Sequence, residues 1–317
     1  MTLLEAIDAY IDWRRGHGAR FITSAWLLHR FCTHVGGDID CGAVREEDVL
    51  GFLAGNGPLT RYRARKYGTL AGFWRYAISR GHATRSPLPA RDDEPRTPEP
   101  APPYVFSRDE LQRLFGAIDT SRHRTVQLDA DTLRALLLLL YGAGLRLGEA
   151  QRLTFDDVDL NDAVLTIRDT KFFKNRLVPV GSQLADALRS HAARRREYPL
   201  PKGMASTFLA NRDGTPLARR TAQTAFVRVL KAAGIQHDKN DGQRAPSLHS
   251  LRHAAAIHRL EAWYRQGADV QRLLPALSTW LGHSNLDGTR VYLSMTPELL
   301  QQASVRFEQY VKGDNHE

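Results

Sequence analysis

Arg146 lies in a glycine-rich segment, residues 141–150, that could present a guanidinium group to a phosphate. Glycines let the backbone turn tightly, and the pattern predicts that Arg146 stands at the start of a new helix. The planar fork of an arginine side chain matches the oxygens of a phosphate group. The segment is also typical of a plain helix surface, because Arg146 and Glu149 have the spacing of an ordinary ion pair along a helix.

Two further segments contain histidines beside groups that could act on a phosphate. In one, His249 and Arg252 stand three positions apart and would share a face of a helix. That face would offer a hydrogen-bond donor next to a fixed positive charge, although a partly buried histidine beside an exposed arginine fits the same pattern. In the other, His283 follows a glycine and Tyr292 comes nine positions later. A lone tyrosine in such an apolar segment is more often part of a hydrophobic core.

A proline-rich segment, residues 91–104, divides the elements that must position these groups. Closely spaced prolines forbid a helix and favour an extended connector, so we expect one domain over 1–90 and a second over 105–317. Amphipathic patterns predict an all-helical first domain, with helices over 3–16, 20–35, 44–55 and 59–80. Thr2 and Glu5 have the spacing of a capping box at the first helix.

The second domain combines helices with a few short strands. Its helices are predicted near 107–118, 130–143, 183–196, 219–233, 249–266, 269–281 and 297–311, and Ser107 and Glu110 match another capping box. Strand-forming runs lie at 157–160, 163–168 and 176–180, with one more possible strand at 207–210. The predicted fold class is therefore mainly α with a small antiparallel β-sheet (α+β).

The overall charge favours a polyanionic partner such as nucleic acid, since the chain carries a formal charge of +9 and a pI near 9.7. Two cysteines, Cys32 and Cys41, are too few for a disulfide framework or a four-ligand zinc site. No signal peptide or membrane-spanning run is recognisable. These features predict a cytoplasmic protein that does not enter a membrane.

A basic face is predicted on the last helix of the first domain. Arg61, Arg65 and either Lys66 or Tyr62 fall on neighbouring positions at helical spacing. Such a face could bind DNA phosphates, although a basic helix face can also serve only solubility.

Taken together and in this order, the three segments resemble the tyrosine recombinase, or phage integrase, family. That family shows Ala-Gly-Leu-Arg-x-x-Glu, a β-hairpin lysine, His-x-Leu-Arg-His, Leu-Gly-His, and a tyrosine nine residues after that histidine. The resemblance covers residues 105–311 and implies a catalytic domain preceded by a helical core-binding (DNA-binding) domain. It assigns the catalytic roles to an arginine pair, two histidines and a nucleophile: Arg146, Arg252, His249, His283 and Tyr292.

The family's lysine corresponds to one of two residues in the turn between the second and third predicted strands. Spacing back from residues 176–179 favours Lys171, and Lys174 is the alternative. Phe172 and Phe173 occupy a turn where the family often has small residues, which suggests an apolar contact. The stretch between the second arginine and the Leu-Gly-His segment is also longer than in compact Xer recombinases, and therefore favours a mobile-element type.

The chemistry that the resemblance implies needs no metal and no cofactor. Tyr292 would attack a DNA phosphodiester and form a 3′-phosphotyrosyl bond while two arginines neutralise the phosphate charge. Lys171 would protonate the leaving oxygen, and His249 and His283 would bond the phosphate or assist proton transfer. Glu149 is expected to orient Arg146 or a neighbouring histidine.

The resemblance also implies partners: four protomers acting on two double-stranded DNA recombination sites, for integration, excision or resolution of a mobile element. The sequence leaves open an accessory protein and whether the C-terminal helix docks on a neighbour. Three alternatives remain: a metal-dependent phosphoesterase using His249, His253 and His283, an inert DNA-binding accessory protein with this fold, and an enzyme like type IB topoisomerases.

Overall fold

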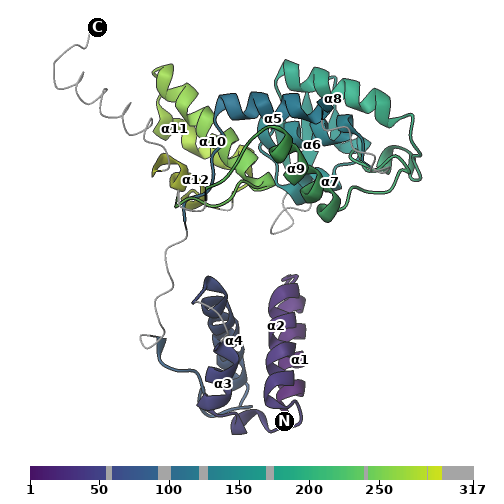
Figure 1. Cartoon of the computed structure of the whole chain (residues 1–317). Helices are drawn as coiled ribbons and strands as arrows, with labels where there is room; N and C mark the ends of the chain where they lie inside the picture. The colour runs from purple at the N-terminus through teal and green to yellow at the C-terminus, as the bar shows by residue number, and fades with distance from the viewer. Residues whose placement is uncertain are drawn as a thin grey trace, which may run out of the picture. The chain divides into compact units, whose positions relative to one another are not determined.

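The computed structural model describes residues 1–54, 59–91, 101–120, 128–168, 175–238, 242–283 and 285–294 of the 317-residue chain. The chain divides into two compact units, Met1–Pro100 and Ala101–Glu317 (Figure 1). The predicted fold class, mainly helical with a small antiparallel sheet, is confirmed. No helix in the described ranges is long and apolar enough to cross a membrane.

The N-terminal unit is a helical bundle. Its helices are α1 (Leu3–Gly16), α2 (Ile22–Val35), α3 (Glu46–Leu53) and α4 (Arg61–Ser79). The capping box predicted at α1 is present, because the Glu5 N–H donates to Thr2 Oγ1 at 3.2 Å and the Thr2 N–H donates to the Glu5 carboxylate at 2.9 Å. The inner helix faces bury one apolar core, which includes Leu3, Ile7, Leu28, Phe31, Leu70, Phe73 and Trp74.

Helices also form most of the C-terminal unit. The longer ones are α5 (Arg108–Thr120), α6 (Ala130–Gly142), α8 (Ser182–Arg195), α9 (Arg219–Ala232), α10 (Leu248–Arg265) and α11 (Val270–Leu281). The short ones are α7 (Leu147–Arg152), α12 (Asp287–Arg290) and a 3-10 turn, η6 (Val291–Ser294). The capping box of α5 is confirmed by reciprocal bonds between Ser107 and Glu110. The predicted helix over 297–311 lies outside the described residues.

Helix α6 lies at the centre of this unit and packs against α5, α8 and α10. Apolar side chains cover most of this helix, and Leu133, Leu136, Leu137, Leu139 and Leu140 are all buried, whereas Arg134 is half-buried and pairs with Asp119. A helix with so wide an apolar surface requires neighbours on several faces. The residues that follow α6 are therefore held on a rigid core element.

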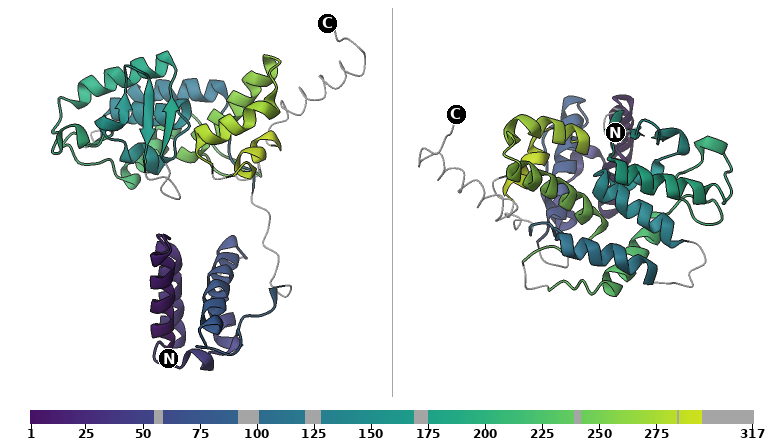
Figure 2. Two further views of the ribbon diagram at one scale, coloured as in Figure 1. Left: turned by 180° about the vertical axis from the view of Figure 1, so that it is seen from behind. Right: turned by 90° about the horizontal axis from the view of Figure 1, so that it is seen from above.

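The sheet has the order β1 (Val158–Asp159), β2 (Val164–Ile167) and β3 (Arg176–Pro179), with antiparallel neighbours (Figure 2). Leu165 pairs with Val178, and both point into the core. The predicted strand over 207–210 is wrong, because Thr207 and Ala210 each form only one isolated bridge. The segment that pairs with Thr207 continues directly into a 3-10 turn, and Ala210 pairs with a residue on the other side of a tight turn.

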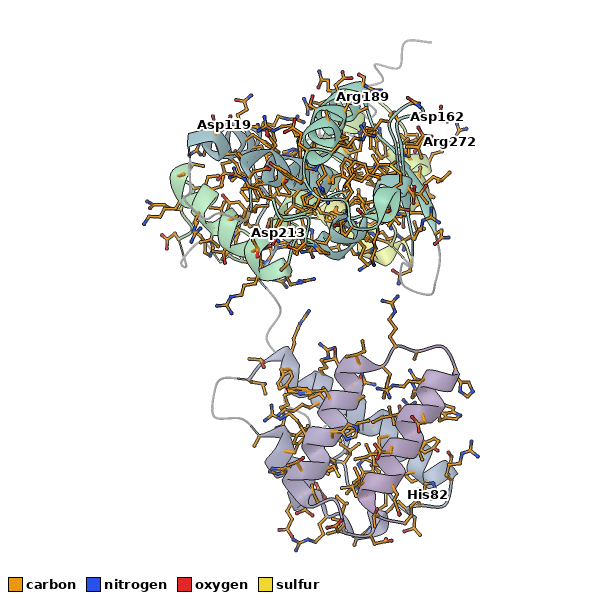
Figure 3. The ribbon with its side chains drawn as sticks, turned by 90° about the vertical axis from the view of Figure 1, so that its right-hand side faces the viewer. His82, Asp119, Asp162, Arg189, Asp213 and Arg272 are labelled. Atoms are coloured by element: carbon orange, nitrogen blue, oxygen red, sulfur yellow. The ribbon has the colours of Figure 1, made fainter. Side chains whose placement is uncertain are left out.

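Charged side chains cover the outside of the C-terminal unit. Figure 3 labels Asp119, Asp162, Arg189, Asp213 and Arg272, which are all exposed. The groups considered next differ from this surface, because most of them are buried.

Candidate active site

Arg146 stands at the N-terminus of α7, as predicted, directly after the turn that ends α6. Gly144 in that turn has φ +60°, and an added Cβ would lie 2.6 Å from the Trp280 ring, so only glycine fits there. The Arg146 guanidinium donates to Glu149 at 2.8 Å and to the Gly282 carbonyl at 2.8 Å. Its side chain stays 37% exposed and can reach a ligand from solvent.

Arg252, on α10, is 1% exposed and joins two turns of the backbone. One terminal nitrogen donates to the Gly144 carbonyl at 2.5 Å, and the other donates to the Leu281 carbonyl at 2.6 Å. Burial, followed by the charge of Arg146, lowers the Arg252 pKa to about 10. Arg252 is still cationic at neutral pH, and its Nε has no hydrogen-bond partner among the described residues.

Glu149 connects Arg146 to a third arginine, Arg176 on β3. The Arg176 guanidinium donates to both Glu149 oxygens, at 3.1 and 2.9 Å, and Nε donates to the Trp280 carbonyl at 3.2 Å. Burial alone would raise the Glu149 pKa, but the bonds and charge of Arg176, and then Arg146, lower it to about 2. Glu149 therefore orients Arg146, as expected, and also fixes the start of β3.

Arg176 packs against the Leu-Gly-His turn as well. Gly282 has φ +68°, and an added Cβ would lie 2.4 Å from Arg176 Nη1. Sequence reasoning missed Arg176, although a signal was available. Side chains alternate along a strand, so Arg176 faces the same side as the buried Val178, and an inward arginine needs a carboxylate partner.

Tyr292, in η6, is 4% exposed and packs on apolar side chains of α10 and α11 that include Ala256, Leu260 and Leu277. Figure 1 shows α10, α11 and α12 close together, and α11 packs against both of the others. Burial raises the Tyr292 pKa, against the charges of Arg252 and Arg146. The hydroxyl therefore keeps its proton in this structure at neutral pH.

Three histidines lie around this hydroxyl. His253 Nδ1 is 3.1 Å from it, and the His283 ring is stacked beside the Tyr292 ring at 6.2 Å between centroids. His249 packs edge-on against His253 at 4.5 Å. Burial is the main cause that lowers all three pKa values, to about 3 for His253 and about 4 for His283. All three rings are therefore neutral at physiological pH.

The structure thus brings together Arg146, Arg252, His283 and Tyr292. His249 is linked to Tyr292 through the His253 ring. His253 itself was considered only as a metal ligand. Its position next to Tyr292 could not be seen in the sequence, where 39 positions separate the two residues. Within the ranges that the structure covers, no three His, Cys, Asp or Glu side chains are placed to hold a metal ion.

The remaining predicted site residues are the lysine between β2 and β3 and three basic residues of the N-terminal unit. Lys171 and its alternative Lys174 fall outside the described residues. In the N-terminal unit, Arg61 and Arg65 are exposed at the start of α4. Lys66 instead donates to the Phe52 carbonyl at 2.6 Å, and burial lowers its pKa. DNA contacts by these three residues stay a prediction.

Comparisons with known proteins identify the family of this chain. The model of the phage integrase family matches residues 105–298. The putative integrase/recombinase y4rE of Sinorhizobium fredii is 36% identical over 95% of this chain and 94% of its own length. Tyrosine recombinase XerA of Thermococcus kodakarensis is 30% identical over 95% of this chain and 93% of its own. This chain is therefore more similar to y4rE than to this XerA protein, which agrees with the sequence-based preference for a mobile-element type over an Xer type.

A solved structure shows the same fold. A lambda integrase tetramer bound to a Holliday junction superposes with a TM-score of 0.64 and 18% identity, over 90% of this chain and 78% of that one. Lambda integrase has also been solved as a dimer bound to a COC' core site, with a TM-score of 0.65 and 18% identity. The chain belongs to the phage integrase family of tyrosine recombinases, the enzymes that perform site-specific DNA recombination.

Proposed function

We propose that this recombinase cleaves DNA by attack of the Tyr292 hydroxyl on a phosphodiester held by Arg146 and Arg252, and leaves a 3′-phosphotyrosyl bond. The observation that carries the proposal is the convergence of both guanidinium groups on the Leu281–His283 turn beside Tyr292. Glu149 balances only one of the arginine charges there, so the site keeps net positive charge for a phosphate.

Two further groups complete the reaction. Lys171, between β2 and β3, protonates the leaving 5′ oxygen, with Lys174 as the alternative. The anchoring of Arg176 to Glu149 supports this role, because it fixes the end of that connection next to the arginines. Burial, and then the arginine charges, lower the pKa values of His249 and His283. A bound phosphate offsets those charges, and both rings donate hydrogen bonds to its oxygens.

Assembly on DNA follows from strand exchange, which needs two cuts in each of two duplexes. Four protomers therefore act on two recombination sites, and the core-binding domain, residues 1–90, binds DNA through Arg61 and Arg65. The similarity to an integrase/recombinase favours integration, excision or resolution of a mobile element as the role.

The test uses pooled DNA fragments from the genetic neighbourhood of the gene. Each fragment carries nicks, so that the short piece released by cleavage is lost and the covalent protein–DNA adduct cannot religate. The full-length protein is incubated with them in EDTA, and SDS-resistant protein–DNA adducts are isolated and sequenced. We expect an adduct with the unmodified protein and none with Tyr292→Phe. Tyr141→Phe is the matched control, because Tyr141 is another tyrosine of this unit bonded to a histidine of α10.

Each alternative predicts a different result. Specific binding without any adduct would indicate an inert accessory protein. An adduct that EDTA abolishes would indicate metal-dependent chemistry. Relaxation of supercoiled plasmids that lack the recovered site would indicate a topoisomerase.

A further inference from the structure

The hydrogen bond between Tyr292 and His253 has no part in the roles proposed so far. It joins the attacking oxygen to an imidazole nitrogen 3.1 Å away. The other two histidines are differently placed, because His283 Nδ1 lies 2.8 Å from the Thr289 hydroxyl and His249 only packs on the His253 ring. His253 is therefore the histidine in position to act on the Tyr292 proton.

The protonation states fix the direction of this bond. The phenol carries its proton, because burial raises the Tyr292 pKa. The imidazole is neutral, because burial and the neighbouring charges lower the His253 pKa. The hydroxyl then donates to Nδ1, and the ring hydrogen is on Nε2. An unprotonated nitrogen within hydrogen-bond distance of a nucleophile's proton has the geometry of a general base.

We propose that His253 Nδ1 takes the proton of Tyr292 as its oxygen attacks the scissile phosphate, an inference that rests on the proposed function. The bond between Tyr292 Oη and phosphorus forms, the phenolic proton moves to His253, and the bond from phosphorus to O5′ breaks. O5′ receives its proton from the general acid. In religation the 5′ hydroxyl gives its proton back to the group that served as general acid and attacks phosphorus, the bond from phosphorus to Tyr292 Oη breaks, and His253 returns its proton to the phenol.

Bound DNA makes His253 a stronger base. The titratable and charged groups that act on His253 are His249, Arg252, Arg244 and His283, and all of them disfavour a proton on it. A phosphodiester bound to Arg252 adds negative charge at this place and offsets that repulsion. A bound phosphate therefore makes proton transfer from Tyr292 to His253 easier than it is at the empty site.

The test is the His253→Asn variant, assayed by single-turnover adduct formation on the trapped site across a pH series. Its amide oxygen can take the place of Nδ1 and accept the Tyr292 hydrogen bond, but it cannot act as a base. We expect a rate lower by about 10²–10⁴-fold. We also expect loss of the rise in rate with pH that deprotonation of His253 produces once the bound phosphate has raised its pKa. His253→Gln is the second variant, and rates are compared per molecule that binds the site.

His258 provides a matched control on the same helix. Its Nδ1 is 3.0 Å from the Tyr141 hydroxyl, it is 8% exposed, and burial lowers its pKa to about 4. His258→Asn therefore changes a similar histidine–tyrosine pair, but one that lies away from the proposed phosphate site. We expect it to lower the melting temperature and to leave the cleavage rate and its pH profile as in the unmodified protein.

A DNA substrate with sulfur in place of the leaving 5′ oxygen distinguishes loss of the general base from loss of the general acid. A thiolate leaves without a proton, so Lys171→Ala should recover on this substrate while His253→Asn stays slow. Recovery of His253→Asn, or an unmodified rate and pH profile for it on ordinary DNA, would overturn the inference. Absence of an adduct with the unmodified protein would instead count against the proposed function.

Discussion

The two halves of the proposed active site differ in the interactions that hold them in place. The arginine cluster consists of Arg146, Arg176, Arg252 and Glu149. The tyrosine cluster consists of Tyr292, His253 and His283. Hydrogen bonds to one carboxylate and to the backbone of two turns fix the first. Apolar packing holds most of the second, together with hydrogen bonds of the His253 and His283 rings to hydroxyl groups and a hydrogen bond between Arg252 and Tyr292.

This difference separates binding from activation. The arginine cluster is charged and is held in place by its own hydrogen bonds, so little reorganisation would be needed to bind the proposed phosphate. The tyrosine cluster is neutral, because the pKa of Tyr292 is raised and the pKa of His253 is lowered. We expect changes in the arginine cluster to affect both stability and cleavage, and changes in the tyrosine cluster to affect mainly cleavage.

The largest effect is expected for Arg252→Lys. An ammonium group keeps the charge but cannot reach the carbonyls of both Gly144 and Leu281 as the planar fork does. Cleavage should fall by about 10²–10³-fold, and the unfolding free energy by about 1–3 kcal/mol. Arg146→Lys is the comparison, because its side chain is 37% exposed. Urea unfolding should show a smaller loss for Arg146→Lys, and equal losses would contradict the structural role of Arg252.

After the loss of cleavage expected for Arg252→Lys, the next largest effect is a loss of stability expected for Glu149→Gln. Loss of this carboxylate leaves Arg176 buried without its ion partner, at a cost of about 3 kcal/mol. Glu149 has its pKa lowered from 4.5 to about 2, so its contribution to stability is full above about pH 5 and disappears as the pH falls toward 2. The difference in unfolding free energy between the two proteins should therefore shrink over that pH range. A constant difference would mean that Glu149 titrates normally.

The smallest effect is expected for Gly282→Ala, which places a Cβ 2.4 Å from Arg176 Nη1 at φ +68°. The strain should cost about 2 kcal/mol and displace Arg176. Gly234→Ala is the matched control, because Gly234 has φ +65° but its nearest neighbour, Arg113, is 3.9 Å away. Thermal unfolding should show a larger loss for Gly282→Ala, while equal losses would indicate backbone strain alone.

Much of this architecture could be predicted from the sequence because its causes are local. The capping boxes at Thr2 and Ser107 and the apolar periodicity of the helices depend on neighbouring residues. The turn that holds Arg146 depends on Gly144 in the same way. The isolated bridges of Thr207 and Ala210 were not predictable, because strand pairing depends on distant segments.

The site was predicted only in part for the same reason. Motif order suggested that Arg146, Arg252 and Tyr292 act together, but no pattern placed Arg176 beside Glu149, 27 positions away. Nor did the spacing show that His253 lies against the Tyr292 hydroxyl. Contacts between side chains far apart in the sequence depend on how the elements pack.

Arg252 has a consequence for how lineages of such proteins lose activity. Because its guanidinium ties the turn after α6 to the turn after α11, a descendant that no longer cuts DNA would still need it to fold. Tyr292 makes no comparable link between turns, and a phenylalanine could fill the same apolar space. Inactive descendants should therefore keep the arginine and lose the tyrosine first, so the presence of Arg252 in a related sequence is no sign of a working enzyme.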